Sequence, residues 1–182
     1  MHRKTLLELL QAYRAPEAER PILERFVHFV SSQSDCFERS LLQGHVTASA
    51  WVFDRSRTRV LLTHHVKLGR WLQLGGHADG DTDVLSVAIR EVLEESGLTR
   101  CSVLTRQIFD IDIHEIPQYG SVPAHKHYDV RFLIEADASE ILVPTDESHE
   151  VRWVDLEKVA QFTQEESILR MLEKSKKWRD TP

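Results

Sequence analysis

Three glutamates lie close together in one short segment of the 182-residue chain, at positions 91, 94 and 95. On an α-helix, Glu91, Glu94 and Glu95 fall within an arc of about 100° and therefore share one face. Carboxylates at this spacing repel each other and weaken the helix. A divalent cation relieves that repulsion, and oxygen ligands of this kind suit Mg²⁺ or Mn²⁺. The spacing indicates a metal site, with an ordinary solvated helix face as the alternative.

A longer pattern surrounds these glutamates. Gly76 opens a loop 14 residues before Arg90, and Gly97 stands where a left-handed helix C-cap is wanted. The segment resembles the Nudix box, the family pattern G-x5-E-x7-R-E-U-x-E-E-x-G-U, in which U is a bulky aliphatic residue. Eight of the nine specified positions match, and the expected strand, loop and helix agree with that pattern.

One position departs from the pattern. Thr82 stands where the family has a glutamate that mainly braces the box arginine, here Arg90. A neutral threonine cannot form that ion pair, so Asp81 or Asp83 would have to replace it from a shifted backbone. The alternative is that Thr82 serves as the N-cap of the helix.

The resemblance covers about residues 43–162 and implies a chemistry. Members of the family mostly hydrolyse a nucleoside diphosphate linked to another group, with Mg²⁺ or Mn²⁺ as cofactor. Carried over to this chain, the resemblance makes the three glutamates metal ligands, completed by a backbone carbonyl of Gly75 or Gly76. It makes Arg90 the residue that orients them. The cations neutralise the pyrophosphate and activate a water that attacks phosphorus in line.

The box does not fix the general base. In some members it is a box glutamate, for which Glu94 is the candidate here, and in others it is a carboxylate on a later loop. Glu147 and Glu150 precede a short expected strand, where such a loop would lie. Both are candidates for the base, and ordinary loop surface is the alternative.

Cationic and imidazole side chains flank the glycine turn. Lys67 and Arg70 precede it and are candidates to contact the phosphates of the substrate, with a solvated hairpin end as the alternative. His77 follows Gly76, and we expect both to line the substrate site.

A second histidine-rich stretch lies further along the chain. His125 and His127 would point to the same face of a strand, with Asp129 next along it. No cysteine lies nearby, so the sequence gives little support for a structural zinc site.

Hydrophobic patterns predict the elements that must position these residues. Helices are expected over residues 3–14, 19–31, 82–96, 155–161 and 165–178, and strands over residues 45–53, 58–63, 71–74, 103–113, 128–135 and 151–154. They mix without regular βαβ alternation, which favours an α/β/α sandwich with a mixed β-sheet. We expect a Nudix-like domain over residues 43–182 that includes a C-terminal helix, preceded by an N-terminal helical extension over residues 1–42.

Composition excludes several classes of protein. Lysine and arginine number 23 against 29 aspartates and glutamates, and residues 75–98 hold most of the acidic excess. Charges elsewhere nearly cancel, so we expect no nucleic-acid partner. No apolar run approaches the roughly 20 residues that span a bilayer, so we expect no membrane partner. Two cysteines give no disulfide framework, and we expect a cytoplasmic protein.

The extension carries two apolar helix faces, and each large side chain on them would contribute about 1.5–3 kcal/mol when buried. These side chains are Leu6, Leu7, Leu10, Phe26, Val27 and Val30. They must pack on the domain, on each other or on a second subunit. We expect a homodimer through the extension, because closed twofold dimers are the commonest oligomers, and a monomer is the alternative.

Several functions remain open for a chain of this kind. The first is hydrolysis of a nucleotide sugar or ADP-ribose to a nucleoside monophosphate and a sugar phosphate, because sugar-nucleotide hydrolases that resemble this chain often use such an extension in a dimer. The second is a housecleaning pyrophosphatase for nucleoside triphosphates. An isopentenyl diphosphate isomerase would need a catalytic cysteine and a histidine-rich metal site, and Cys36 and Cys101 stand in no such context. A non-catalytic nucleotide sensor of this family usually has lost some of these glutamates, and the intact Glu91, Glu94 and Glu95 speak against that function.

The small-molecule nucleotide substrate would also need contacts to its base. Trp71, Phe109 and Tyr119 are candidates to stack on that base, with packing in the core or a loop as the alternative.

Overall fold

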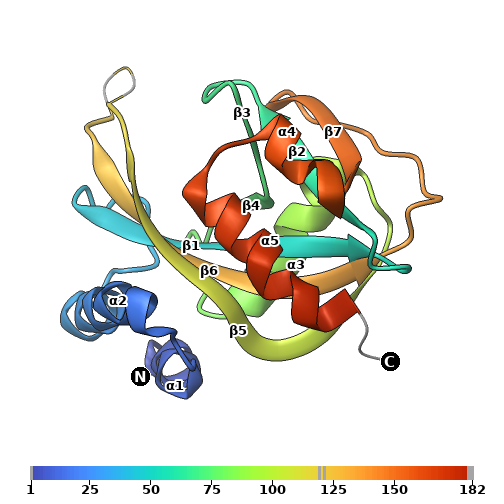
Figure 1. Ribbon diagram of the computed structural model, residues 1–182. Helices are drawn as coiled ribbons and strands as arrows, with labels where there is room; N and C mark the ends of the chain where they lie inside the picture. Colours follow the sequence, from blue (N-terminus) through green and yellow to red (C-terminus); the bar gives the residue numbers. More distant parts are fainter. Residues whose placement is uncertain (1, 119, 121, 180–182) are drawn as a thin grey trace.

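A seven-stranded sheet forms the centre of the structure, a computed structural model that describes residues 2–118, 120 and 122–179 (Figure 1). Its strands are β1 (Gly44–Asp54), β2 (Arg59–His65), β3 (Arg70–Leu72), β4 (Leu74–His77), β5 (Cys101–Ile116), β6 (His125–Ala136) and β7 (Ser148–Asp155). They follow the order β3-β2-β1-β6-β5, with β4 paired to β1 and β7 paired to β2. Strands β1 and β6 are parallel and the other pairs are antiparallel, so the sheet is mixed, as predicted.

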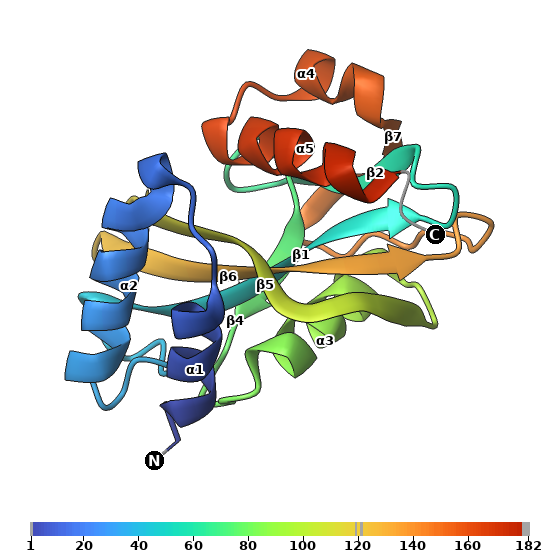
Figure 2. The same ribbon diagram turned by 60° about the horizontal axis from the view of Figure 1, so that its bottom comes forward.

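Helices cover both faces of this sheet. They are α1 (Lys4–Ala12), α2 (Arg20–Ser32), α3 (Val84–Ser96), α4 (Val159–Phe162) and α5 (Glu166–Arg179), with short 3-10 turns at Glu17–Glu19 and Leu156–Lys158. In Figure 2, α4 and α5 lie above the sheet, α3 lies below it, and α1 and α2 stand at its left end. The predicted α/β/α sandwich with N-terminal helices is confirmed. No helix in the described part of the chain is long and apolar enough to cross a membrane.

Strand β1 is buried along its whole length because both of its faces are covered. Successive side chains point to opposite faces of a strand. Val52 packs with Val92 of α3, while Trp51 packs with Ile168 of α5. The two faces of this strand therefore belong to two different layers of side chains.

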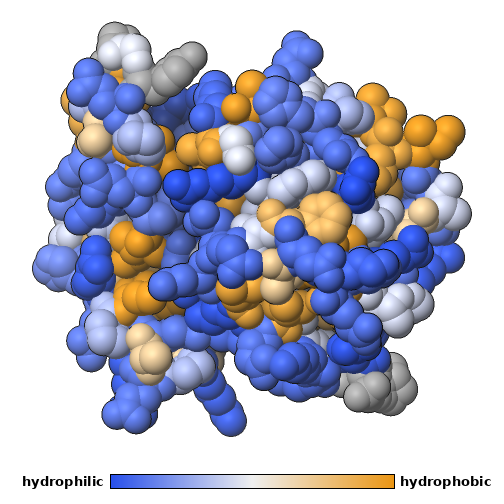
Figure 3. All heavy atoms as spheres, turned by 45° about the horizontal axis from the view of Figure 1, so that its top comes forward, coloured by the Kyte–Doolittle hydropathy of each residue, from blue (hydrophilic) through white to orange (hydrophobic). Residues whose placement is uncertain are grey.

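The extension is part of the same core as the domain. Leu6, Leu10 and Phe26 are fully buried, in one cluster with Val46 of β1 and Val130 of β6. On the face shown in Figure 3, apolar residues form several separate groups among hydrophilic ones. The side chains from which a dimer was expected are thus largely covered within a single chain.

Ion pairs join the extension to the last helix. Glu19, which is buried, accepts hydrogen bonds from the Tyr13 hydroxyl at 2.5 Å and from Lys174 Nζ of α5 at 2.6 Å. Lys174 also contacts Asp110 Oδ1 of β5 at 2.5 Å. Asp110 is in turn bonded to Arg131 of β6, which is almost fully buried. Buried charges of both signs therefore neutralise each other between the N-terminal helices, the sheet and α5.

The predicted boundaries hold with local exceptions. The expected strand over residues 71–74 is two short strands, β3 and β4, on either side of Gln73, and the expected helix over residues 155–161 begins as a 3-10 turn. Helix α3 begins after Asp83, whose carboxylate accepts the Ser86 N–H at 3.2 Å, so Asp83 and not Thr82 is the N-cap. Gly97 ends the helix with φ 73°, the predicted left-handed C-cap.

Candidate active site

Strand β4 and helix α3 bring the glycine turn against the acidic helix face. A Cβ atom on Gly76 would lie 2.3 Å from a carboxylate oxygen of Glu91, and one on Gly75 would lie 2.1 Å from Cβ of Ser49. A side chain at position 76 would displace the carboxylate of Glu91, and one at position 75 would collide with β1. Gly76 therefore lets β4 approach the carboxylate of Glu91 closely, and Gly75 lets it approach the backbone of β1.

Glu95 is the carboxylate whose charge is least compensated. The Gly75 N–H hydrogen-bonds to it, but its Oε2 atom is buried and has no hydrogen-bond partner. Burial, together with the negative charges of Glu91, Glu147 and Glu94, raises the pKa of Glu95 to about 8. Burial also raises the pKa of Glu91, against the opposing effect of Arg90. A divalent cation fits this set of oxygens, because it would supply the positive charge and the ligand contact that Glu95 lacks.

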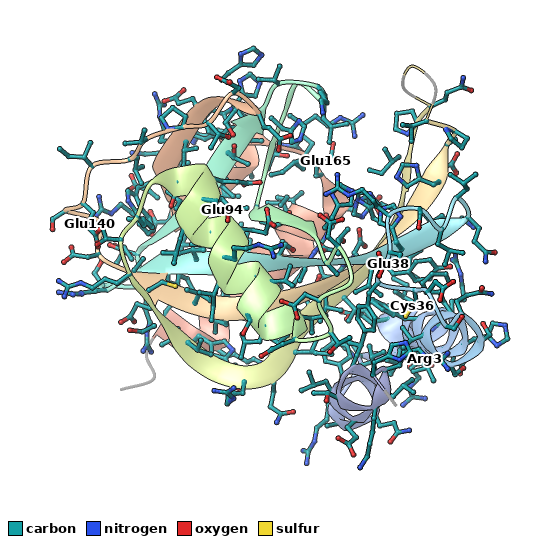
Figure 4. The ribbon with its side chains drawn as sticks, turned by 180° about the vertical axis from the view of Figure 1, so that it is seen from behind. Arg3, Cys36, Glu38, Glu94, Glu140 and Glu165 are labelled. Carbon is teal, nitrogen blue, oxygen red and sulfur yellow. The ribbon has the colours of Figure 1, made fainter. Side chains whose placement is uncertain are left out.

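The third glutamate has a different setting. Glu94 is exposed on α3, the helix that faces the reader in Figure 4. It is close enough to act electrostatically on Glu91, Glu95 and Arg90. The structure thus places Glu91 and Glu95 beside β4 and leaves Glu94 exposed to solvent on the same helix.

Arg90 links the helix to the glycine strand. Its Nη2 atom donates to Glu91 Oε1 at 2.8 Å and to the backbone carbonyl of His77 at 3.1 Å. Neither aspartate next to Thr82 hydrogen-bonds to Arg90 among the described residues. Asp81 accepts the Asp83 N–H at 2.9 Å instead, and Asp83 caps the helix. The brace that the family glutamate would give is replaced here by Glu91 and a backbone carbonyl.

The two loop glutamates differ in their surroundings. Glu147 lies near the site, because its charge acts on Glu95 and on His77, and its carboxylate is 4.0 Å from Lys67 Nζ. Glu150, in β7, forms an ion pair with Arg152 at 2.6 Å. The geometry therefore favours Glu147 of these two as a group that could reach a water in the site.

The other residues predicted to contact substrate are spread over the rim. Lys67 stands with Glu147, whereas Arg70 pairs with Glu165 at 3.0 Å. His77 ends β4 and pairs with Thr47 of β1, so its side chain points to the face opposite Gly76. Of these three, Lys67 is the one that the structure places beside Glu147.

An arginine that the sequence did not single out also stands near the acidic residues. Arg39, in the segment between α2 and β1, forms a two-pronged ion pair with Asp79 of the loop after β4. Glu91 and Glu147 are close enough to raise its pKa further. A single arginine in this segment gives no sequence signal, since the fold is what brings it to this loop.

The aromatic candidates separate in the structure. Trp71 stacks on His64 with ring centroids 5.1 Å apart and meets the edge of Phe162 at 5.3 Å. Phe109 is buried in the core, which leaves packing as its role, and Tyr119 lies outside the described residues. Of the two described candidates, Trp71 is the one that is half-buried, which leaves part of its side chain accessible.

The cysteines are placed where an isomerase could not use them. Cys36 is buried in the cluster formed with Leu6 and Phe26, and Figure 4 shows it beside the N-terminal helices, away from Glu94. Cys101 pairs with Ala136 at the start of β5. Burial raises the pKa of both thiols, which makes each a poor nucleophile.

Comparisons with known proteins agree with this geometry. A family model described as NUDIX domain matches residues 44–174. The MutT protein from Methanosarcina mazei Go1 has a similar structure, with a TM-score of 0.60 and 18% identity over 78% of this chain and 99% of that one. The structure of a C. elegans Ap4A hydrolase in a binary complex has a TM-score of 0.59 and 17% identity. The match covers 73% of this chain and 96% of that one. The structure of a Nudix hydrolase from M. smegmatis, RenU, has a TM-score of 0.56 and 20% identity, over 74% of this chain and 86% of that one. The structural similarity at these low identities shows a shared fold. A search of curated protein sequences found no match.

Proposed function

This chain belongs to the Nudix family and is a pyrophosphohydrolase that acts on acid anhydrides, and from this premise we propose that its substrate is a nucleotide sugar or ADP-ribose. The products would be a nucleoside monophosphate and a sugar phosphate. Cleavage of a pyrophosphate is supported above all by Glu95, a buried carboxylate beside Glu91 with one oxygen unpartnered. The choice of a sugar nucleotide is supported by the extension, since its Arg39 is held on the loop that follows β4.

The site residues divide the work of hydrolysis. Glu91, Glu94 and Glu95 would hold Mg²⁺ or Mn²⁺, with a backbone carbonyl at Gly75 or Gly76. When bound, the cation supplies charge neutralisation of the pyrophosphate and activation of water. Arg90 holds Glu91 and the end of β4 in place through its two hydrogen bonds.

Proton transfer and phosphate binding fall to groups at the rim. Glu147 takes the proton from the attacking water, or Glu94 does so where the substrate brings that water to the helix. Lys67 and Arg39 face the negative charge of the substrate, and Arg70 would reach it by leaving Glu165. Trp71 offers a ring face to the base.

A panel of substrates with product identification tests this proposal. The purified chain is incubated with ADP-ribose, nucleotide sugars, dinucleoside polyphosphates and nucleoside triphosphates, each with Mg²⁺ or Mn²⁺. The products are separated by chromatography and identified by mass spectrometry. We expect a nucleoside monophosphate and a sugar phosphate from the first two classes. Cleavage of nucleoside triphosphates alone, with release of pyrophosphate, would establish the housecleaning function instead.

The assembly and compartment are further parts of the proposal. A homodimer through the extension would now have to use its outer, mostly polar surface, because Leu6, Leu10 and Phe26 are buried within the chain. Light scattering decides the point: a mass near the 21.1 kDa of one chain at all micromolar concentrations excludes the dimer. A cytoplasmic location is supported by Cys36 and Cys101, which are both free.

A further inference from the structure

Three imidazole rings meet on the face of the sheet opposite α3. His45 of β1, His77 of β4 and His127 of β6 each offer a ring nitrogen, and these nitrogens all lie within 4.8 Å of one another. The ring centroids are 5.0 Å apart for His45 and His77, 4.9 Å for His45 and His127, and 5.0 Å for His77 and His127. The distances are nearly equal, so one point lies within reach of all three rings.

Strand register explains why residues so distant in sequence converge. His45 pairs directly with His127 in the parallel ladder between β1 and β6. His77 pairs with Thr47, two residues along β1 from His45. Side chains two residues apart on a strand, and directly paired side chains, point to the same face. The three rings are therefore fixed by the backbone of three adjacent strands.

His45 lacks the contacts that a buried polar ring needs. Its exposed fraction is 3%, and neither ring nitrogen makes a hydrogen bond of good geometry. The carbonyl of Leu41 is near enough to serve as an acceptor for one of the two nitrogens. A metal-ligating histidine typically donates its second N–H to such a carbonyl, so both nitrogens of His45 would be satisfied by a cation on one side and Leu41 on the other.

A fourth histidine already has the orientation of a ligand. His125 Nδ1 lies 2.9 Å from the carbonyl of Pro123, and its Nε2 is hydrogen-bonded to His127 Nε2 at 3.3 Å, so this nitrogen faces the cluster. Two imidazole nitrogens that face each other with lone pairs repel unless a proton or a cation lies between them. A neutral His127 that donates through Nε2 satisfies this pair, and a cation bound between the rings would take the place of that shared proton.

We propose that His45, His77 and His127 form a binding site for a transition-metal cation, Zn²⁺ above all, with His125 or a water as the fourth ligand. Imidazole nitrogens suit zinc and its neighbours, while Mg²⁺ prefers oxygen. In a tetrahedral zinc site with bonds of about 2.0–2.1 Å, the nitrogens stand about 3.4 Å apart. Small rotations of these side chains supply that spacing.

This site differs from the glutamates in place and in chemistry. Gly76 faces α3 and Glu91, and the next residue, His77, faces the other side of the sheet. The two sites are linked through the carbonyl of His77, which accepts the hydrogen bond from Arg90, and through the charge of Glu147, which acts on both Glu95 and His77. A cation on the histidines would tie β1, β4 and β6 together behind the strand that lines the carboxylates.

Cobalt binding to the full chain tests the site, because tetrahedral Co²⁺ absorbs strongly in the visible. We expect this absorption in the wild-type protein, its loss on addition of Zn²⁺, and its persistence in a large excess of Mg²⁺. His127→Gln should weaken binding at least about 100-fold. His77→Gln, at a strand end and less buried, gives the same test if His127→Gln fails to fold. His28→Gln, on the exposed side of α2, is the matched control and should leave binding unchanged.

A double variant separates the two candidate metal sites. Glu91→Gln combined with Glu95→Gln should leave the tetrahedral cobalt spectrum intact. If the spectrum instead disappears in this variant and survives in His127→Gln, the cation belongs to the glutamates and the proposal is overturned. Failure of the wild-type chain to bind Co²⁺ or Zn²⁺ at micromolar concentration overturns it as well.

Discussion

The two sides of strand β4 carry two opposite kinds of chemistry. On the α3 side, Glu91 lies against Gly76 and Glu95 accepts the Gly75 N–H, and on the other side His77 joins two more imidazoles. The carboxylates come from consecutive turns of one helix, whereas the imidazoles come from three strands. The carboxylate group can therefore be predicted from spacing along the chain, whereas the imidazole group depends on how the strands are aligned.

The largest effect should follow from a change on the carboxylate side. We expect Glu95→Gln to lower kcat by about 10³-fold or more, because the amide cannot supply the charge that a divalent cation needs beside a pyrophosphate. The measurement is steady-state turnover of the best substrate from the panel, with circular dichroism to verify the fold. Glu157→Gln, at an exposed position, is the control. Near-normal turnover of Glu95→Gln would remove this residue from the site.

A smaller effect should distinguish the two loop glutamates. Glu147→Gln should lower kcat by about 10²-fold, the usual contribution of a general base, and should leave metal affinity nearly unchanged. Glu150→Gln should change kcat little, since its carboxylate is engaged by Arg152. Comparing the pH–rate profiles of both variants gives the answer. Equal rates for wild-type and Glu147→Gln enzyme would point to Glu94 as the base.

The metal-free protein should show the contrast between the two sides as opposite pH dependences of stability. The pKa of Glu95 is raised from 4.5 to about 8, so the folded state keeps a proton that the unfolded state loses, and stability falls as pH rises through this range. Burial, together with His77 and His125, lowers the pKa of His45 from 6.5 to about 4, so stability falls as pH drops below 6.5.

Thermal unfolding in the presence of a chelator, from pH 4 to pH 9, measures both pH dependences of stability. Between pH 4.5 and 6.5 the two effects oppose each other, whereas between pH 6.5 and 8 the effect of Glu95 remains and the Tm of the metal-free chain should fall. We expect Glu95→Gln to flatten this fall above pH 6.5 and to steepen the loss of stability below it. A decline above pH 6.5 that is equally steep in the Glu95→Gln variant would show that another group causes it.

The smallest effect concerns the start of the helix that carries the carboxylates. Asp83→Ala should lower the free energy of unfolding by about 1 kcal/mol, because the capping carboxylate at Ser86 is lost. Thr82→Ala should change it by less than about 0.5 kcal/mol, since Thr82 is not the cap. Chemical denaturation of both variants makes the comparison, and a reversed order would restore Thr82 as the cap.

The sequence was informative where chemistry follows local periodicity. Glu91, Glu94, Glu95 and the Gly97 cap lie within one helix and its end, so their spacing alone predicts their placement. His45 could not be connected to His77 and His127, because the β1–β6 register that aligns them joins residues 82 positions apart. Arg39 was missed because its partner Asp79 is also distant in the sequence, 40 positions away. The Thr82 cap was wrong because the aspartate next to it competes for the same role.

The contacts between Glu19 and Lys174 also bear on how the chain is made. These two residues are 155 positions apart, and the apolar faces of α1 and α2 pack on β1 and β6. During synthesis, the first two helices emerge long before the strands that cover them, and their ion-pair partner in α5 comes later still. Until then their leucines and phenylalanines stand in water, where they are natural sites for a chaperone or for aggregation. A ribosome that stalls before α5 therefore leaves Glu19 without its partner Lys174.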